Sequence, residues 1–164
     1  MTWYESMDQL PDIDDYDIIK GKRTYRYFDG NVLYPFGYGL TYSDIKVEAV
    51  DVKLSGDSIF ADVAMSNSGV SGSDVLQVYF KSDSKDAVRN HALCAFKKVR
   101  LEAGETKRIT LEIPLKALTV VSDEGTRYLD KGAKTVLYFG TSQPDELSCS
   151  LTGKKPVAVE VRLG

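Results

Sequence analysis

The sequence contains very little histidine, and this excludes several kinds of active site. Its 164 residues include a single histidine, His91, so a metal site built on several histidines is excluded and a catalytic triad would have to use this residue. His91 follows the polar Asn90, and no serine stands in the context of a nucleophile elbow. We interpret His91 as a surface histidine.

Cysteine is almost as scarce. Cys94 and Cys149 are 55 positions apart and show no metal-ligand spacing. A chain of this size does not suggest a fold that depends on disulfides, so we expect two free thiols in strands, with a disulfide between them as the alternative. Free thiols favour a reducing compartment, and the expected location is therefore cytoplasmic.

Long apolar runs and an excess of basic residues are also absent. No run approaches the roughly 18 apolar residues of a membrane-spanning helix, and residues 1–20 lack the basic start and apolar centre of a signal peptide. The net charge is −3, and no basic stripe of the kind that binds a phosphate backbone is present. We therefore expect neither a membrane nor a nucleic acid as a partner.

Short alternating apolar runs fill the chain from Ile45 onward, with turn residues between them every eight to twelve positions. This spacing is typical of antiparallel sandwiches and barrels, and no segment shows a long helical period. The number of runs, about eight, predicts an all-β, immunoglobulin-like antiparallel sandwich. The only helix expected is a single turn at residues 114–118.

The expected strands cover residues 45–54, 59–65, 75–80, 92–101, 109–113, 128–129, 135–140, 147–151 and 157–163. In the first of them the alternation changes phase near Ala49, which indicates a β-bulge. The second presents four alternating apolar residues to the core, namely Ile59, Ala61, Val63 and Met65. Residues 81–90 are polar and predict a surface loop.

Aromatic residues are concentrated near the N-terminus. Ten of the seventeen aromatic residues lie within the first 42 positions, and seven of them fall in residues 23–42. No charged residue follows position 29 in this stretch, so other protein surface must cover it. We term residues 25–42 the aromatic strap and expect it to be pinned to the sandwich from Leu33 onward, with Leu33, Phe36 and Leu40 facing the core.

Three blocks of the sequence carry a resemblance to a known family. They are Tyr25-Arg-Tyr-Phe28 with Leu33-Tyr-Pro-Phe-Gly-Tyr-Gly-Leu-Thr-Tyr42, then Val63-Ala-Met-Ser-Asn-Ser-Gly69 with Gly72 and Val75-Leu-Gln-Val-Tyr79, and finally Phe96-Lys-Lys-Val-Arg-Leu101 with Ala103-Gly-Glu105 and Tyr138-Phe-Gly140. With these blocks the chain resembles the C-terminal part of glycoside hydrolase family 3 enzymes, the β-glucosidases and β-xylosidases. It departs from the family pattern at Ala95 and Ile45.

The resemblance implies a fibronectin type III-like sandwich over residues 33–164. Residues 1–32 would then be an extended linker and the end of a preceding middle α/β domain. In the family the nucleophilic aspartate lies on an N-terminal barrel, and the acid/base glutamate usually comes from the middle domain. The resemblance therefore implies an accessory domain with no catalytic residue and no cofactor, whose partners are the barrel and α/β domains of a retaining β-glycosidase acting on β-linked glucosides or xylosides.

The one dense cluster of acids does not predict a catalytic site. Glycoside hydrolysis needs two carboxylates held roughly 5–9.5 Å apart. Asp12, Asp14, Asp15 and Asp17 lie in the expected linker, where nothing fixes such a separation or raises a pKa by burial. The cluster also does not match a calcium-binding loop, because Asp17 occupies the position at which such a loop needs a glycine. We interpret the cluster as a solvated charge run and expect no metal.

Two roles remain open for the aromatic strap. Pro35 and the clustered glycines suit a buried crossing between domains, which would make the strap a bracing element. The candidate residues for interdomain packing are Tyr25, Tyr27, Tyr34, Phe36, Tyr38 and Tyr42. Tyrosines on an extended surface also form sugar-stacking platforms, so a carbohydrate-binding module is the alternative. An exposed aromatic patch also leaves room for a dimer.

Overall fold

Antiparallel strands account for most of the regular structure, as the alternating apolar pattern predicts. The computed structural model describes residues 3–163. Its longer strands are β3 (Ile45–Ser55), β4 (Ser58–Asn67), β5 (Gly72–Ser82), β6 (Ala92–Leu101), β7 (Thr106–Pro114), β10 (Thr135–Gly140) and β11 (Val157–Val161). Two pairs of short strands are β1 (Trp3–Tyr4) with β2 (Val32–Tyr34) and β8 (Val120–Val121) with β9 (Arg127–Tyr128).

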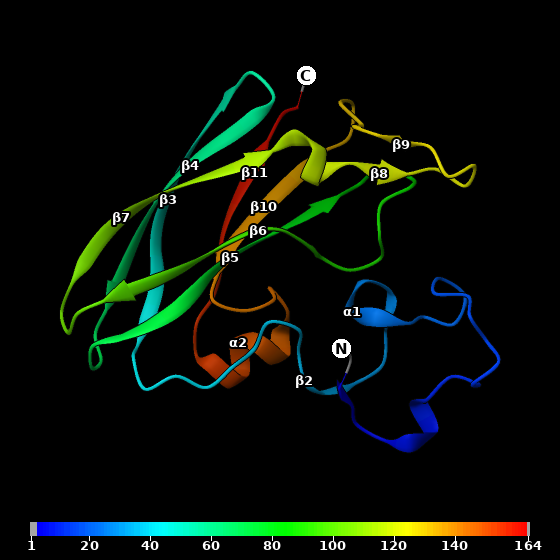
Figure 1. Ribbon diagram of the computed structural model, residues 1–164, viewed down its shortest axis with the longest axis horizontal. Coiled ribbons are helices and arrows are strands. Elements are labelled where there is room, and N and C mark those ends of the chain that lie inside the picture. Colours follow the sequence, from blue (N-terminus) through cyan, green and yellow to red (C-terminus); the bar gives the residue numbers. More distant parts are fainter. Residues whose placement is uncertain (1–2, 164) are drawn as a thin grey trace.

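The longer strands build a two-layer sandwich. One sheet has the order β11-β10-β5-β6, and the other has the order β3-β4-β7 (Figure 1). Every pairing in both sheets is antiparallel, and strands distant in sequence become neighbours, as β4 does with β7 and β5 with β10. The predicted immunoglobulin-like sandwich of the fibronectin type III-like kind is confirmed.

Two β-bulges interrupt the pairing. In β3 the register against β4 shifts between Val47 and Ala49, where the sequence alternation changes phase. In β6 the extra residue is Cys94, since Ala95 pairs with Val78 and Leu93 pairs with Tyr79. The Cys94 thiol donates to the Val78 carbonyl at 3.2 Å, so the bulge places this side chain against β5.

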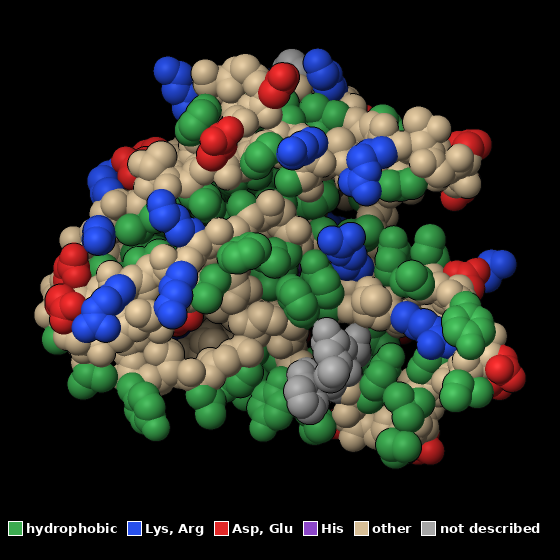
Figure 2. Space-filling view, viewed as in Figure 1, with side chains coloured by type: hydrophobic (Ala, Val, Ile, Leu, Met, Phe, Trp, Pro, Cys, Tyr) green, Lys and Arg blue, Asp and Glu red, His purple; other side chains and the backbone are tan. Residues whose placement is uncertain are grey.

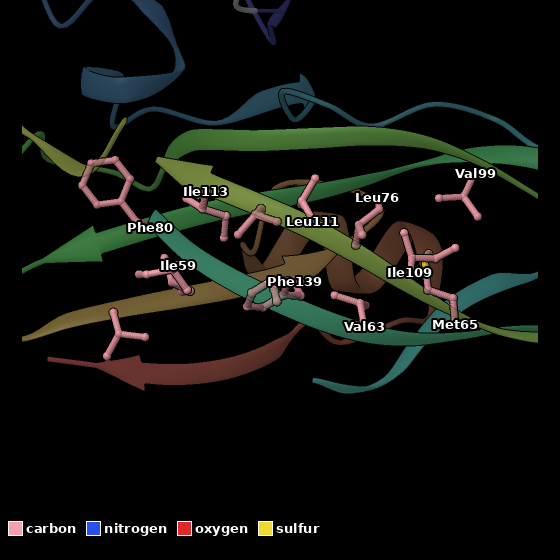
Figure 3. Packing of buried hydrophobic residues seen from close by; sticks show 14 of the residues in the cluster. Ile59, Val63, Met65, Leu76, Phe80, Val99, Ile109, Leu111, Ile113 and Phe139 are labelled. Atoms are coloured by element: carbon pink, nitrogen blue, oxygen red, sulfur yellow. The ribbon is translucent and has the colours of Figure 1, made fainter. Parts of the chain in front are cut away.

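The hydrophobic core lies between the two sheets. The four alternating residues predicted for β4 all face inward and are at most 1% exposed: Ile59, Ala61, Val63 and Met65. They meet inward-facing side chains of β5, β6, β7 and β10, several of which Figure 3 shows: Leu76, Phe80, Val99, Ile109, Leu111, Ile113 and Phe139. Burying one large apolar side chain contributes about 1.5–3 kcal/mol, so this cluster is the main source of stability.

A buried asparagine, Asn67, joins the turns at one end of the sandwich. Its side-chain nitrogen donates to the carbonyls of Val70, Leu101 and Glu102, and its side-chain oxygen accepts from the amides of Asp44 and Gly69. The distances lie between 2.9 and 3.3 Å. Because Asn67 is 1% exposed, water cannot reach these backbone groups and satisfy them in place of its side chain.

The segment before β3 lies beside one end of the sandwich (Figure 1). It contains two short helices, η1 (Met7–Gln9) and α1 (Thr24–Tyr27), and the β1–β2 pair closes it. Between the helices the chain makes turns in which the Asp12 and Asp15 carboxylates accept hydrogen bonds from backbone amides two residues further on. The proposed division between residues 1–32 and 33–164 stays a prediction.

The expectation of a single helix is wrong. The helical turn predicted at 114–118 is present as η2 (Leu115–Leu118), but η1, α1 and α2 (Glu146–Thr152) are helices as well. α2 replaces the strand predicted at 147–151, and it places Cys149 in a helix instead of a strand. None of the helices in residues 3–163 is long and apolar enough to cross a membrane.

Capping residues at its two ends explain why the α2 segment is helical. The Asp145 carboxylate accepts from the Ser148 amide at the N-terminus of the helix, and Gly153 ends it with a φ of 68°. These signals outweigh the alternation of Leu147, Cys149 and Leu151, which resembles a strand in sequence.

We predict that Asn67→Asp destabilises the sandwich by at least about 2 kcal/mol, since an aspartate loses two donors and brings a charge among backbone carbonyls. Urea unfolding followed by circular dichroism measures the change. Asn31→Asp, at an exposed position, is the matched control and should stay within about 0.5 kcal/mol of the parent chain. Equal unfolding midpoints for both variants would contradict the role given to Asn67.

We also predict two free thiols in each chain, because both cysteines are unpaired in the structure. Burial raises the pKa of Cys94 to about 12, so this thiol should resist a thiol reagent in the native state. In denaturant without reductant, both thiols should react. Comparison with Cys94→Ser assigns the slow group, and a count of zero in the denatured chain would show a disulfide instead.

Candidate functional site

Two side chains of β5 hold the aromatic strap on the outer face of the four-stranded sheet. Leu76, Val78 and Phe80 face the core, so Gln77 and Tyr79 lie on the opposite face, yet both are buried, at 7% and 0% exposed. The strap is what covers them. Burial also raises the pKa of Tyr79, which keeps its hydroxyl protonated as a hydrogen-bond donor.

The contacts between these side chains and the strap are polar and specific. Gln77 Nε2 donates to the carbonyls of Gly37 and Thr141, each at 2.8 Å. The Tyr79 hydroxyl donates to Gln77 Oε1 at 2.7 Å and lies 3.4 Å from the Phe36 carbonyl. One glutamine therefore connects the strap, β5 and the loop after β10.

Gly37 is required where the strap approaches Gln77. Its φ is +79°, a value that side chains rarely permit. A Cβ at this position would lie 2.2 Å from Gln77 Oε1 and 2.5 Å from the Tyr79 hydroxyl. Gly39, two residues later, has no atom within 4 Å of the corresponding position, so only the first glycine serves the contact.

Aromatic contacts join the start of the strap to Phe36 and both to the sheet. The Tyr25 and Phe36 rings stack with centroids 3.9 Å apart and planes 7° apart. Phe36 in turn meets Tyr79 edge to face at 6.5 Å. The Tyr25 hydroxyl also accepts from the Leu93 amide of β6 at 3.1 Å. The stack is therefore anchored to both β5 and β6.

Asn90, in the loop before β6, holds α1 in place. Its side-chain nitrogen donates to the carbonyls of Tyr25 at 2.9 Å and Phe28 at 2.7 Å. Its backbone amide donates to the Arg26 carbonyl at 2.9 Å. Three of the carbonyls in and directly after this short helix are thus satisfied by one residue of the sandwich.

The six candidate residues for interdomain packing differ in exposure. Tyr25, Tyr27, Phe36 and Tyr38 are half-buried, while Tyr34 and Tyr42 are 50% and 98% exposed. The structure brings four of them together in two pairs, Tyr25 with Phe36 at 3.9 Å and Tyr34 parallel to Tyr38 at 5.7 Å. Their role in packing between domains stays a prediction.

The expectation that Leu33 and Leu40 face the core is wrong, since they are 52% and 93% exposed. The strap runs over the outer face of a sheet whose inner face already closes the core. On that face Phe36 and Gly37 cover Tyr79 and Gln77, so the expectation that Phe36 faces the core is wrong as well. The two leucines consequently point away from the sandwich.

An open groove of about 650 Å³ lies between the N-terminal segment and the end of the sandwich. Aromatic residues of the strap line one side, and Asp145 and Glu146 at the start of α2 line another. His91 also lines the groove and lies edge-on to Tyr138 at 4.8 Å. It is half-buried instead of exposed as we expected, and burial lowers its pKa, so the imidazole is neutral at pH 7.

The acidic run has the character of a solvated surface. Asp12, Asp14 and Asp17 are exposed, and hydrogen bonds from the backbone, first that of Lys20, lower the pKa of Asp17. A general acid for glycoside hydrolysis needs a raised pKa, so this shift has the wrong direction. Within residues 3–163, no group of three or more histidine, cysteine or acidic residues is arranged to hold a metal ion.

Gln77 and Asn90 were not found from the sequence. Gln77 lies within an apolar strand and Asn90 ends a polar loop, and their partners lie 40 and 65 positions away in the chain. For Gln77 a signal did exist, since it interrupts the nearly continuous apolar run from Val75 to Phe80. A polar residue in such a run indicates a partner on the outer face.

Comparison with known proteins places the fold in a family. Residues 74–143 match the family model of the fibronectin type III-like domain. The chain is thus a fibronectin type III-like domain with an N-terminal extension. More particularly, it is similar to a part of β-glucosidases and β-xylosidases, among them a glycoside hydrolase family 3 enzyme.

The chain is 36% identical over 136 residues to a β-glucosidase of Kluyveromyces marxianus, a match that covers 80% of this chain and 16% of the relative. It is 33% identical over 149 residues to a xylan 1,4-β-xylosidase of Xylanibacter ruminicola, covering 89% and 17%. Among solved structures, the family 3 β-glucosidase of Bifidobacterium adolescentis matches with a TM-score of 0.72 and 27% identity, covering 87% and 21%. The chain therefore spans about a fifth or less of these relatives.

We predict that Gly37→Ala lowers the free energy of unfolding by about 2–4 kcal/mol, because the methyl group meets Gln77 and the backbone conformation is strained. Gly39→Ala is the control and should change it by less than about 0.5 kcal/mol. Thermal and urea unfolding of the two variants measure the difference. If both alanines are tolerated equally, the strap does not contact the sheet as described.

Phe36→Ala should cost about 3 kcal/mol, since it removes the ring between Tyr25 and Tyr79. Tyr42→Ala, at a fully exposed ring of the same strap, should cost less than about 0.5 kcal/mol. Chemical unfolding monitored by tyrosine fluorescence compares the two. A large loss for Tyr42→Ala with none for Phe36→Ala would invert the assignment of buried and free rings.

Proposed function

We propose that the chain is a non-catalytic accessory domain that braces the catalytic domains of a family 3 β-glycosidase. The observation that carries the proposal is the two-sided character of the aromatic strap. One side is fixed to β5 through Gln77 and Tyr79. On the other side, four large side chains of the strap are half or more exposed: Leu33, Tyr34, Leu40 and Tyr42.

Exposed apolar side chains continue from the strap into the N-terminal segment. Met7, Ile13, Tyr16, Ile18 and Ile19 are all more than half exposed. In Figure 2 hydrophobic side chains gather along the lower border of the molecule, over the strap and the N-terminal segment. Apolar surface grouped on one side of a domain supports a protein partner there. The barrel and α/β domains of a longer enzyme are the partners that we propose.

The activity proposed for the longer enzyme rests on its relatives. Those named above are a β-glucosidase and a xylan 1,4-β-xylosidase, so we propose a retaining hydrolase of β-linked glucosides or xylosides, without a cofactor. The acidic residues at 12–17 are solvated and offer no carboxylate pair in a cleft. The two free thiols favour a cytoplasmic location for this enzyme.

Carbohydrate binding by the stacked rings of the strap is less well supported. A sugar-stacking platform needs free ring faces, but Tyr25 and Phe36 cover one face of each other at 3.9 Å. Tyr34 and Tyr38 lie parallel with their centroids 5.7 Å apart. Tyr42 is the ring that remains fully exposed. Packing against another domain can use the edges of stacked rings as well as their free faces. It therefore fits the stacked arrangement better than sugar binding does.

A chimaera tests the bracing function. The matching segment of the Kluyveromyces marxianus β-glucosidase is replaced by this chain, and the activity and melting temperature of the whole enzyme are measured. We expect an active chimaera, which Gly37→Ala destabilises and Gly39→Ala does not. An enzyme whose stability is the same with the chain, with the Gly37→Ala chain and with no domain at all would exclude a bracing role.

The isolated chain should hydrolyse neither 4-nitrophenyl β-glucoside nor 4-nitrophenyl β-xyloside. Turnover above buffer that persists through repurification, and that is lost when a single acidic residue is changed, would overturn the non-catalytic assignment. Affinity electrophoresis of the same preparation in a gel that contains xylan tests the alternative, carbohydrate binding. Retardation that disappears in Tyr42→Ala would support a carbohydrate-binding strap instead.

A further inference from the structure

A second, smaller pocket lies between the end of the strap and α2. Its volume is about 220 Å³, and its walls come from residues 38–41, 43 and 44, from the loop after β10 and from the C-terminal part of α2. Asp74, near the start of β5, also lines it. In Figure 2 the surface is hollowed between the strap and the sheet. The pocket is separate from the larger groove and shares no lining residue with it.

Charged groups of both signs line this pocket. The Lys154 ammonium lies 3.0 Å from an Asp44 carboxylate oxygen and donates to the Ile45 carbonyl at 2.8 Å. Asp74 adds a second carboxylate to the lining. The Lys154 charge is balanced by Asp44, so Asp74 leaves the lining with a net negative charge, and an anion would be repelled. The pocket therefore suits a ligand without negative charge that can donate hydrogen bonds.

Asp74 has unused hydrogen-bonding capacity. Its carboxylate is half-buried, and within the described residues the hydrogen bond that it accepts comes from the adjacent Val75 amide at 2.7 Å. An ionised carboxylate can accept about four hydrogen bonds. Burial raises the pKa of Asp74, which shows that its charge is incompletely solvated. A ligand with several hydroxyl groups would supply the missing donors.

The rest of the lining combines hydroxyl groups with apolar surface. Ser142 contributes a hydroxyl, and the Thr152 hydroxyl also lines the pocket but already donates to the Ser148 carbonyl. Tyr38 and Leu40 contribute an aromatic ring and an exposed aliphatic side chain at the strap. A sugar ring has both a hydroxyl rim and faces of C–H groups, so it can use both kinds of surface. The volume is below the roughly 300–1,000 Å³ of drug-sized ligand sites, which limits the ligand to about one ring.

We propose that this pocket binds one neutral sugar ring, with Asp74 and Lys154 contacting its hydroxyls and Tyr38 lying against its apolar part. The site does not use the stack of Tyr25 and Phe36, and Tyr38 is the one of the seven aromatic residues of the strap that lines it. It would add a ligand-binding function to a bracing domain, and it does not depend on the bracing function being correct.

Nuclear magnetic resonance titration of the ¹⁵N-labelled chain with D-glucose and with D-xylose tests the proposal. We expect saturable amide shifts confined to residues 38–44, 73–75, 141–142 and 151–155, with a Kd in the millimolar range. Asp74→Asn keeps the shape of the side chain and removes its charge, so it should weaken binding about tenfold. Asp123→Asn, at an exposed turn, is the control and should bind as the parent chain does.

Three outcomes would overturn the sugar site. The first is the absence of saturable shifts with either sugar in the parent chain, which is independent of any variant. The second is equal affinity in Asp74→Asn and Asp123→Asn, when both give the parent spectrum elsewhere. The third is a response of the same amides to calcium chloride or to D-glucuronate instead of the neutral sugars, which would assign the pocket to an ion.

Discussion

The burial of two polar side chains on the outer face of a sheet is the constraint on which the structure outside the core depends. Gln77 and Tyr79 stand among apolar neighbours, and the strap supplies the carbonyls that they need. Without the strap, Gln77 and Tyr79 would lose the carbonyl groups that accept their hydrogen bonds and the side chains that cover them. Each unsatisfied group would lower the stability by about 1–3 kcal/mol. The strap therefore behaves as a fixed part of the sandwich, and the exposed side chains on its far side keep a defined arrangement that a partner can recognise.

Features with a period of two were predictable from the sequence. The sandwich, the bulge near Ala49 and the inward residues of β4 follow from alternation, because each strand buries one face. α2 was missed, because a cap at Asp145 and a glycine at Gly153 outweigh a short alternating pattern. The aromatic strap was recognised as a unit, but the direction of Leu40 depends on Gln77 and Tyr79, which are about forty positions away. Local pattern contains no information about such contacts.

Stacking within the strap changes what its aromatic residues can do. The close stack of Tyr25 with Phe36 uses ring faces that a sugar would otherwise occupy. The sequence favoured packing over sugar binding and left both open, and this stack supports packing. The polar pocket beside α2 shows the opposite combination, with opposed charges, hydroxyls and only one strap ring. The same short segment thus presents an apolar surface on one side and contributes to a polar cavity on another.

The loop between β5 and β6 has a consequence for how the domain can vary in length. Lys81 donates from its ammonium group to the carbonyls of Val88 and Arg89, and the next residue, Asn90, holds α1. Most surface loops accept insertions at little cost. An insertion between Lys81 and Asn90 would instead displace α1 and, with it, the Tyr25 ring under Phe36. Length variation should accumulate at free turns such as the one at Gly56. The loop between β5 and β6 should keep its length, because that length sets the position of the N-terminal segment relative to the sandwich.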